Sequence, residues 1–444
     1  MHTFTKQGVK DLIFRQYFLP MATNQFRQYH HELADTAWLF VLQGLNLLVP
    51  LFVWPYLMRT VGAEQFGVFG FAHALADYAC LIVDFGFNLS ATKRVVLARE
   101  NKAELNRIFS ATMCAKIILL FIAFCLYASV LFIPRYQAYR TMALFMFLSV
   151  VASTFSMVWL FQGMGKIRLV SIIQAVSKII FLPNVFWLIK SPDDLWIAVT
   201  IHCSMHICSM VAVLIVLHNR HWVRPVRVTK DDILGEMKLS APIFLSQAAT
   251  SIYTALFVVI LAYFVSKQEV GWYTSSEKIM RVMVSVVLLP ISGAFYPKIS
   301  ALSISNKSEA QRFIRWIILF LGVFFSIAGL ALCLAADFII DWLGPDYNGM
   351  QPLLYMVAFL PIPITIGAVC GQFGLLALGD EHSKKTYTRV YYVAALWALI
   401  SVFVLSKLFG VVGTMASLAS TEILVCVSMA YYYIKYVKKT VFNN

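Results

Sequence analysis

The chain has 444 residues, of which 60% are hydrophobic and only 13% are charged, and its formal net charge is +14. A soluble domain carries roughly 45–50% apolar and about 25% charged residues. The composition therefore excludes a soluble multidomain protein and indicates a membrane protein with many spans. Because Lys and Arg on cytoplasmic loops make such proteins basic, the charge gives no reason to expect a nucleic-acid partner.

Apolar runs of about 20 residues predict membrane-spanning helices, because that length covers the roughly 30 Å hydrocarbon core of a bilayer. The sequence predicts an all-α polytopic membrane protein with twelve such helices. In chain order they are expected near 36–58, 66–90, 108–133, 141–162, 167–189, 195–217, 239–265, 271–296, 313–335, 351–378, 386–406 and 411–434.

The distribution of Lys and Arg supports this topology and gives its orientation. With both termini in the cytoplasm, 26 of the 36 Lys and Arg residues lie in segments expected inside and 6 in segments expected outside. Cytoplasmic loops are enriched in these residues. We therefore expect both ends inside. The first 35 residues lack the apolar core of a signal peptide and are expected to form a cytoplasmic extension, with Met1 and Met21 both possible starts.

A weak internal repeat divides the chain into two halves. Residues 62–69 match residues 266–273 at an offset of 204, and the segment from Glu104 to Ile108 is echoed from Glu309 to Phe313. Two halves of six spans have the same orientation and can rock about a central cavity, as in parallel-repeat transporters. We expect a six-helix bundle at 36–217, a basic cytoplasmic linker at 218–238, a second pseudo-symmetric bundle at 239–434 and a tail at 435–444.

Three motifs carry a resemblance to a known family. They read Pro-Tyr-Leu-Met-Arg-Thr-Val-Gly-Ala-Glu-Gln-Phe-Gly at 55–67, Asp-Phe-Gly-Phe-Asn-Leu-Ser-Ala-Thr at 84–92 and Trp-Leu-Phe-Gln-Gly at 159–163. The chain resembles the polysaccharide transporter family, the O-antigen flippases of the multidrug/oligosaccharidyl-lipid/polysaccharide exporter superfamily. The resemblance extends from about residue 37 to the C-terminus. Family members often have an acidic residue after the third motif, whereas this chain has Met164, Gly165 and Lys166 there.

The resemblance implies a transporter in the bacterial inner membrane and not an enzyme. Its function would be the transfer of undecaprenyl-pyrophosphate-linked oligosaccharide, an O-antigen or related repeat unit, from the cytoplasmic to the periplasmic leaflet. Its partners would be membrane lipids and, as candidates, a polysaccharide polymerase and a chain-length regulator.

Charged residues inside the expected spans are the candidate functional groups, because a charge at bilayer depth costs about 2.5–3.5 kcal/mol on insertion scales. A pyrophosphate needs cations along its path. The candidates for a cationic substrate path are Arg59, Lys116, Lys178, Lys278 and Arg281, with Lys93 and Arg94 as an extension at the inner end of the second span. The alternative for these bases is a set of internal salt bridges with Asp77, Asp84, Glu277 and Glu422, and for Lys93 and Arg94 it is anchoring at the cytoplasmic surface.

Asp84, Glu422 and Asp77 are candidates for ion coupling, with H⁺ or Na⁺ as the coupling ion and no other cofactor. His202 and His206 are four residues apart and lack a third ligand nearby in the sequence, so a polar seam is favoured over a metal site. The eight cysteines form no Cys-x-x-Cys pair, and we expect no disulfide or zinc site. Pro361 and Pro363 predict a kink in the tenth span.

Two other functions stay open. A multidrug/cation antiporter of the same superfamily would need an acidic cavity, whereas acids and bases inside these spans are balanced. A membrane polymerase or glycosyltransferase would need a large loop with catalytic groups, and no expected connection exceeds about 25 residues. The sequence contains no Walker-type loop, so we expect no nucleotide hydrolysis to drive transport.

Overall fold

The structure is a computed structural model that describes Gly44 and residues 49–442. The expected extension at 1–35 and most of the first expected span lie outside the described residues. The described residues are helical almost throughout. In chain order the elements are η2 (Val49–Val53), α3 (Trp54–Asp84), α4 (Phe87–Ala98), α5 (Lys102–Phe132), η3 (Pro134–Tyr139), α6 (Arg140–Thr154), α7 (Val158–Gly163), α8 (Ile167–Phe181), α9 (Pro183–Leu188), η4 (Pro192–Asp194), α10 (Leu195–Arg220), α11 (Lys230–Phe264), α12 (Lys267–Ser305), α13 (Lys307–Leu334), α14 (Ala336–Leu343), η5 (Pro345–Met350), α15 (Gln351–Ala358), α16 (Pro361–Val369), η6 (Cys370–Ala377) and α17 (Glu381–Phe442).

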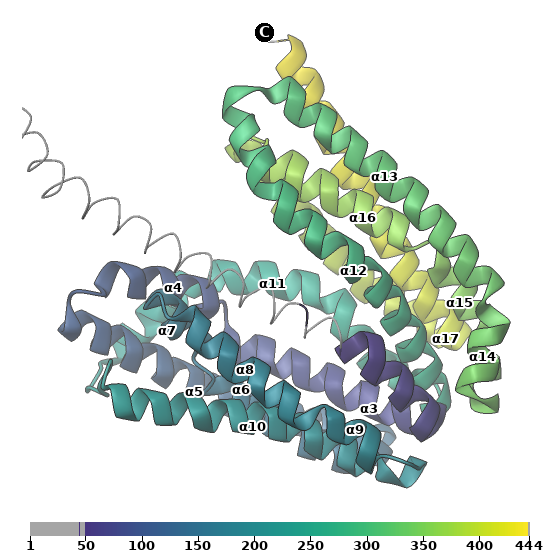
Figure 1. The fold of residues 1–444 in the computed structure, drawn as a ribbon, viewed down its shortest axis with the longest axis horizontal. Helices are drawn as coiled ribbons and strands as arrows, with labels where there is room; N and C mark the ends of the chain where they lie inside the picture. Colours follow the sequence, from purple (N-terminus) through teal and green to yellow (C-terminus); the bar gives the residue numbers. More distant parts are fainter. Residues whose placement is uncertain (1–43, 45–48, 443–444) are drawn as a thin grey trace, which may run out of the picture.

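Figure 1 shows two groups of helices that diverge from a shared end. The first group contains α3 to α10, and the second contains α12 to α17. Helix α11 packs against α3 and α5 of the first group and against α17 of the second, and α3 packs closely on α12 where the groups meet. Among the described residues, nine helical segments are long and apolar enough to cross a membrane. The chain is therefore a multi-pass membrane protein.

Two glycines produce kinks inside segments that otherwise read as continuous helix. Gly62 has φ 76° inside α3, and Gly410 has φ 56° inside α17. Left-handed φ values are favourable for glycine and strained for other residues. Each kink falls between two expected spans, so that α3 and α17 each contain parts of two of them.

Other helices are interrupted where the sequence has special residues. Helix α3 ends at Asp84, followed by Phe85 with φ 42° and Gly86 with φ 81°, so the Asp-Phe-Gly motif is a break between α3 and α4. The predicted interruption of the tenth span is confirmed, because α15 ends at Ala358 and α16 begins at Pro361. A proline at the first helical position needs no backbone donor there.

The internal repeat has a structural counterpart. Asn101 accepts a hydrogen bond from the backbone N–H of Glu104 at the start of α5, at 3.2 Å. Asn306 does the same for Glu309 at the start of α13, at 3.1 Å. Such N-caps satisfy donors that the first helical turn leaves free. The two echoed segments therefore begin their helices with the same local structure.

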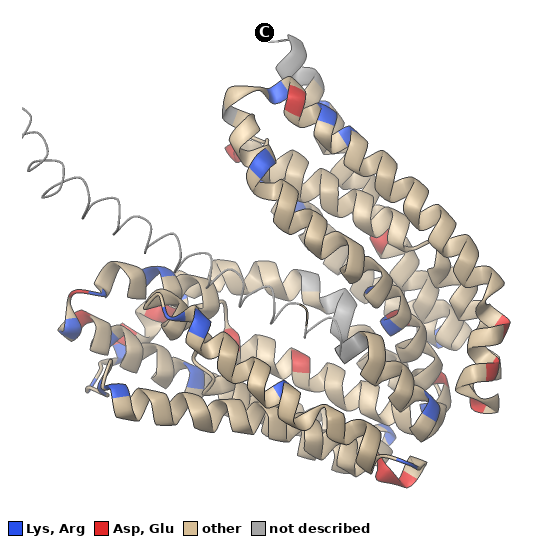
Figure 2. Cartoon of the chain, viewed as in Figure 1, with Lys and Arg blue, Asp and Glu red and all other residues tan. Residues whose placement is uncertain are grey.

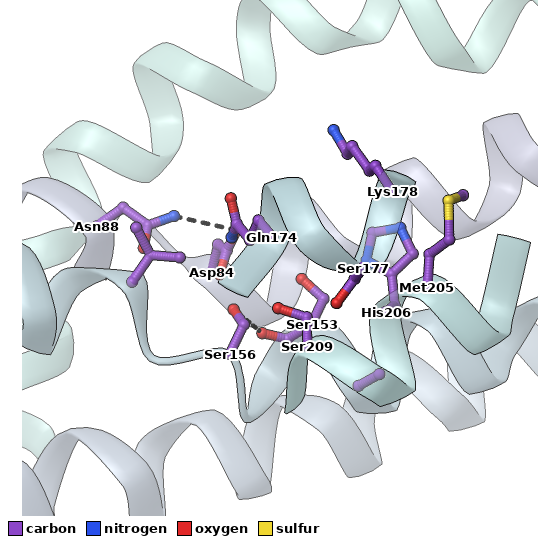
Figure 3. A pocket seen from close by; sticks show the side chains of 12 residues that line it. Asp84, Asn88, Ser153, Ser156, Gln174, Ser177, Lys178, Met205, His206 and Ser209 are labelled. Atoms are coloured by element: carbon purple, nitrogen blue, oxygen red, sulfur yellow. Dashed lines mark hydrogen bonds between the residues drawn. The ribbon is translucent and has the colours of Figure 1, made fainter. Parts of the chain in front are cut away.

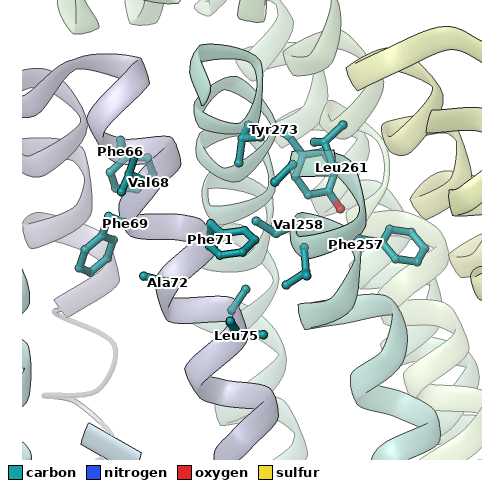
Figure 4. Close-up of a cluster of buried hydrophobic side chains, with 14 of the residues drawn as sticks. Phe66, Val68, Phe69, Phe71, Ala72, Leu75, Phe257, Val258, Leu261 and Tyr273 are labelled. Atoms are coloured by element: carbon teal, nitrogen blue, oxygen red, sulfur yellow. The ribbon is translucent and has the colours of Figure 1, made fainter. Parts of the chain in front are cut away.

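The two helix groups meet at a pair of glycines that correspond in the repeat. A Cβ added to Gly67 would lie 2.7 Å from the backbone N of Gly271 and 2.1 Å from the carbonyl O of Lys267. Phe66, Phe71, Phe257 and Tyr273 are almost fully buried around this crossing (Figure 4). Only residues without a side chain allow the backbones of α3 and α12 to approach this closely.

Candidate functional site

Charged residues are sparse along the middle of the helices and concentrate near their ends (Figure 2). Several of those that lie at depth line two cavities. The first, of about 280 Å³, is enclosed by α3, α4, α6, α8 and α10. Figure 3 shows its polar side chains, which include Asp84, Asn88, Gln174, Lys178 and His206.

One wall of the first cavity is a buried ion pair. Lys116 Nζ of α5 lies 2.9 Å from Asp84 Oδ1, and the lysine side chain is 2% exposed while that of Asp84 is 30% exposed. Asn88 donates a hydrogen bond to the other oxygen of Asp84 at 3.2 Å. Asp84 therefore faces the cavity, and Lys116 supports it from behind. This pairing follows the salt-bridge alternative for these two residues.

The second cavity, of about 370 Å³, lies between α3, α11 and α12, where the two helix groups meet. Its ionisable lining is mixed, because His73 and Asp77 come from α3 and Glu277, Lys278 and Arg281 from α12. Trp54 closes one side. The cavity therefore has both acidic and basic groups in its lining, and such groups at bilayer depth mark candidate binding sites.

Each cation of the second cavity has a defined contact. Lys278 Nζ lies 4.2 Å from the centroid of the Trp54 ring, a cation–π contact. Arg281 Nε donates to Glu277 Oε1 at 2.8 Å, and Arg281 Nη1 lies 3.8 Å from Glu422 Oε1 of α17. The expected pair of Glu277 and Arg281 is thus present, and Glu422 joins it from the other end of the sequence.

The structure brings some of the predicted residues together and separates others. Lys278, Arg281 and Asp77 line the second cavity, whereas Lys178 and Asp84 line the first. Asp77 and Asp84, seven residues apart on α3, therefore serve different cavities. Arg59 lines neither cavity, and its guanidinium lies 5.0 Å from the ring centroid of Trp342 in α14.

Residues at the end of α4 and the start of α5 form an ion-pair network with the start of α11. Arg94 pairs with Glu236 and lies 3.6 Å from Glu104, and Arg107 contacts both Glu104 and Asp232 at 2.9 and 2.7 Å. Hydrogen bonds from Thr229, together with the nearby Arg107, hold the pKa of Asp232 below its usual range. Arg94 thus ties α4 to α11.

The sequence reasoning missed several polar groups of the cavities. His73 is the clearest, because its Nδ1 lies 2.9 Å from Asp77 Oδ2 one helical turn away. The signal was available, since a His and an Asp four residues apart in an apolar span can pair. Asn88, Gln174 and Ser153 of the first cavity gave no comparable signal, because uncharged polar residues are frequent in such helices.

Within the described residues, no group of three His, Cys, Asp or Glu side chains is placed to hold a metal ion. The ring centroids of His202 and His206 lie 5.0 Å apart on α10. The two cavities therefore offer charges and hydrogen-bonding groups and no metal centre within this part of the chain.

A family model described as "Polysaccharide biosynthesis protein" matches residues 33–303, which is more than half of the chain. The chain belongs to this family. The family match confirms the resemblance seen in the three motifs and makes the protein a member of a transporter family that acts in polysaccharide biosynthesis.

Two relatives align with most of this chain. A protein named "Putative O-antigen transporter" from Escherichia coli (strain K12) is 28% identical over 393 residues, which are 88% of this chain and 94% of the relative. A protein of the same name from Shigella dysenteriae is 30% identical over 396 residues, which are 88% and 97% of the two chains. The similarity thus extends over both helix groups.

A solved structure gives the fold independently. The chain is similar to a multidrug resistance MATE family transporter of the MOP superfamily in an inward-facing conformation, with a TM-score of 0.67, 10% identity and coverage of 90% of this chain and 94% of that chain. At this identity the likeness shows the fold alone. The chain therefore has a helical fold similar to that of this transporter.

Proposed function

We propose that the protein is a flippase that moves undecaprenyl-pyrophosphate-linked oligosaccharide, an O-antigen or related repeat unit, from the cytoplasmic to the periplasmic leaflet. The observation that carries the proposal is the set of cations at bilayer depth that line two cavities: Lys178 in the first, and Lys278 and Arg281 in the second. A pyrophosphate that crosses a low-dielectric layer needs such groups, because an unpaired anion is costly there. The family and the names of the two relatives point to a substrate of this class.

The proposed topology has twelve spans with both termini in the cytoplasm. Nine candidate spans among the described residues become ten when α17 is divided at Gly410, and the end of the first expected span, before Gly62 in α3, stands for one more. Helix α11, with 35 residues and an apolar sequence, supplies the twelfth. The helix groups of Figure 1 support an arrangement as two six-helix bundles about a central cavity.

We place the protein in the bacterial inner membrane and assign the described conformation to an inward-open state. Gly67 and Gly271, which are in contact, each lie just after a connection between two spans. The distribution of Lys and Arg places both connections on the periplasmic side of the membrane. The groups are therefore closed toward the periplasm and diverge toward the cytoplasm. Rocking of the groups about this contact would give alternating access, driven by an ion gradient or by consumption of the repeat unit on the far side. A polymerase and a chain-length regulator are the proposed assembly partners.

The first test is deletion of the gene in its host, followed by analysis of surface polysaccharide and lipid-linked intermediates. We expect loss of surface polymer, with repeat units accumulating on the cytoplasmic leaflet and restoration by the intact gene. Unchanged polymer together with altered resistance to cationic drugs would instead identify a multidrug antiporter.

The second test separates a cationic path from structural pairing. In complementation, Lys178→Ala and Arg281→Ala should reduce polymer export, whereas Lys178→Arg and Arg281→Lys should retain most of it. Lys190→Ala is the matched control, because Lys190 lies just after α9 and lines neither described cavity. All variants must insert at wild-type levels. Full export by both alanine variants would refute the cationic path.

A further inference from the structure

Three histidines and an aspartate form a continuous row between the two cavities. Asp77 and His73 line the second cavity and are joined by the 2.9 Å contact already described. The ring centroid of His73 lies 5.2 Å from that of His202 on α10, and His202 lies 5.0 Å from His206. His206 lines the first cavity. The row therefore begins in one cavity and ends in the other.

The spacing of the rings suits transfer between neighbours. At centroid separations of 5.0 and 5.2 Å, ring nitrogens can be joined by a direct hydrogen bond or through one bridging water. A neutral imidazole accepts a proton at one ring nitrogen and can release another proton from the second nitrogen. A proton can thus enter the row at Asp77 and another can leave from His206, with no heavy atom changing its bonds.

The charges around the row limit it to a single extra proton. Asp77 is the carboxylate of the row, and its side chain is 58% exposed to the second cavity. Lys278 of α12 faces Asp77 from that cavity, with Glu277 and Arg281 beside it. Lys178 of α8 shares the other cavity with His206, and the Asp84 carboxylate that also lines this cavity is already paired with Lys116. Helix α6 packs on both α3 and α10 and has no ionisable residue after Arg140 at its start. Protonation of a second histidine would therefore place another positive charge near these cations, and the row contains no second carboxylate to balance it. Such a charge is unfavourable at bilayer depth.

We propose that Asp77, His73, His202 and His206 form a proton path that links the two cavities and holds one proton during each transport cycle. The proposal rests on the proposed function, since the proton would be the coupling ion of the flippase. The row lies on α3 and α10, and its Asp77 end opens to the cavity that α12 also lines, whereas its His206 end opens to the cavity that α8 also lines. Movement of α3 relative to α12 would therefore change the access of the Asp77 end, while the His206 end keeps its surroundings.

The path can be tested without the lipid substrate. The full chain, labelled with ¹⁵N-histidine and placed in lipid nanodiscs, is titrated by NMR, and the three resonances are assigned with His73→Gln, His202→Gln and His206→Gln. We expect Asp77→Asn or His202→Gln to move the titration midpoints of the remaining members of the row. His218→Gln is the matched control. His218 lies near the end of the same helix, α10, outside the row, and its ring centroid lies 6.0 Å from that of His221, which follows the helix. If the titration midpoints of His73 and His206 do not change when His202 is replaced, the proposed proton path is wrong.

A second experiment tests coupling in proteoliposomes that contain the full chain and lipid-linked repeat units from its host. We expect an imposed pH gradient to increase repeat-unit translocation by the wild type and by His218→Gln. His202→Gln and His206→Gln should lose this increase and keep the rate measured without a gradient. A wild type that moves no repeat unit would refute the proposed function, while the titration still decides the proton path. Equal responses to the gradient in wild type and in both row variants would refute the path.

Discussion

The contact of α3 with α12 leads to a sharp prediction for Gly271→Ala. A Cβ at this position would lie 1.9 Å from the carbonyl O of Ala63 and 2.7 Å from its carbonyl C. Both are backbone atoms, so no side chain can rotate away to make room. The substitution must therefore push the two helices apart at the shared end of the helix groups.

The magnitude follows from the type of clash. Overpacking of a close contact costs about 1–3 kcal/mol. If the cost falls on the conformation with α3 and α12 in contact, the conformational equilibrium shifts by about 5- to 150-fold toward states in which they separate. The gain in helix propensity from Gly to Ala, about 1 kcal/mol, is equal in both states and does not alter this ratio.

The assay is a distance measurement by electron spin resonance between labels on the two helix groups. Trp196 of α10 and Phe338 of α14 are 58% and 72% exposed and can carry the labels in a chain whose eight native cysteines are replaced. Gly271→Ala should increase the population at the longer distance. The matched control is Gly293→Ala in the same helix, because a Cβ there meets no atom within 4 Å. Identical distance distributions for the two alanine variants would refute the reasoning.

Three further predictions concern the ion pair and the start of α11. Asp84→Ala should lower the free energy of unfolding by about 3–5 kcal/mol, because it leaves the buried Lys116 unpaired. Lys116→Ala should lower it by about 1–3 kcal/mol, because Asp84 still faces the cavity. Equal losses of the two variants in thermal unfolding would contradict this asymmetry. Thr229→Ala should lower the local stability at the start of α11 by about 1 kcal/mol, measured by hydrogen exchange with the exposed Ser308→Ala as control. Because the pKa of Asp232 is lowered, its contribution is complete above its unfolded pKa of about 3.9 and is lost as the pH falls through the lower folded value, so the same peptide should exchange faster below about pH 4. Exchange independent of pH after correction for its intrinsic rate would contradict the role of this cap.

The helices were predictable from the sequence because lipid demands long apolar segments with satisfied backbone groups. The repeat match also aligned Gly67 with Gly271 before the structure placed them in contact. The breaks within spans were harder to locate. Met157 has φ 48° between α6 and α7, and an isolated methionine in an apolar run carries no signal for such a conformation.

The pairing of charges was only partly predictable. Glu277 and Arg281 are one turn apart, so their contact follows from helix geometry. The partner of Lys116 lies 32 residues earlier on another helix, and the sequence does not give the rotation of one helix against the other. For the same reason His202 and His206 looked like an isolated pair, because His73 reaches them only through the packing of α3 on α10.

The kinks at Gly62 and Gly410 affect how a binding protein can recognise the shared end of the two helix groups, where α3 meets α12. At each kink only one glycine departs from helical geometry, so the kink offers little surface to a binding protein. The segment from Ala336 to Met350 is longer, and it contains three aspartates and no Lys or Arg. An antibody fragment selected against the end of the molecule where α3 and α12 meet should therefore recognise mainly this acidic segment, and its paratope should be rich in basic residues. Because the segment contacts both α12 and α3, such a fragment would be expected to fix one conformation.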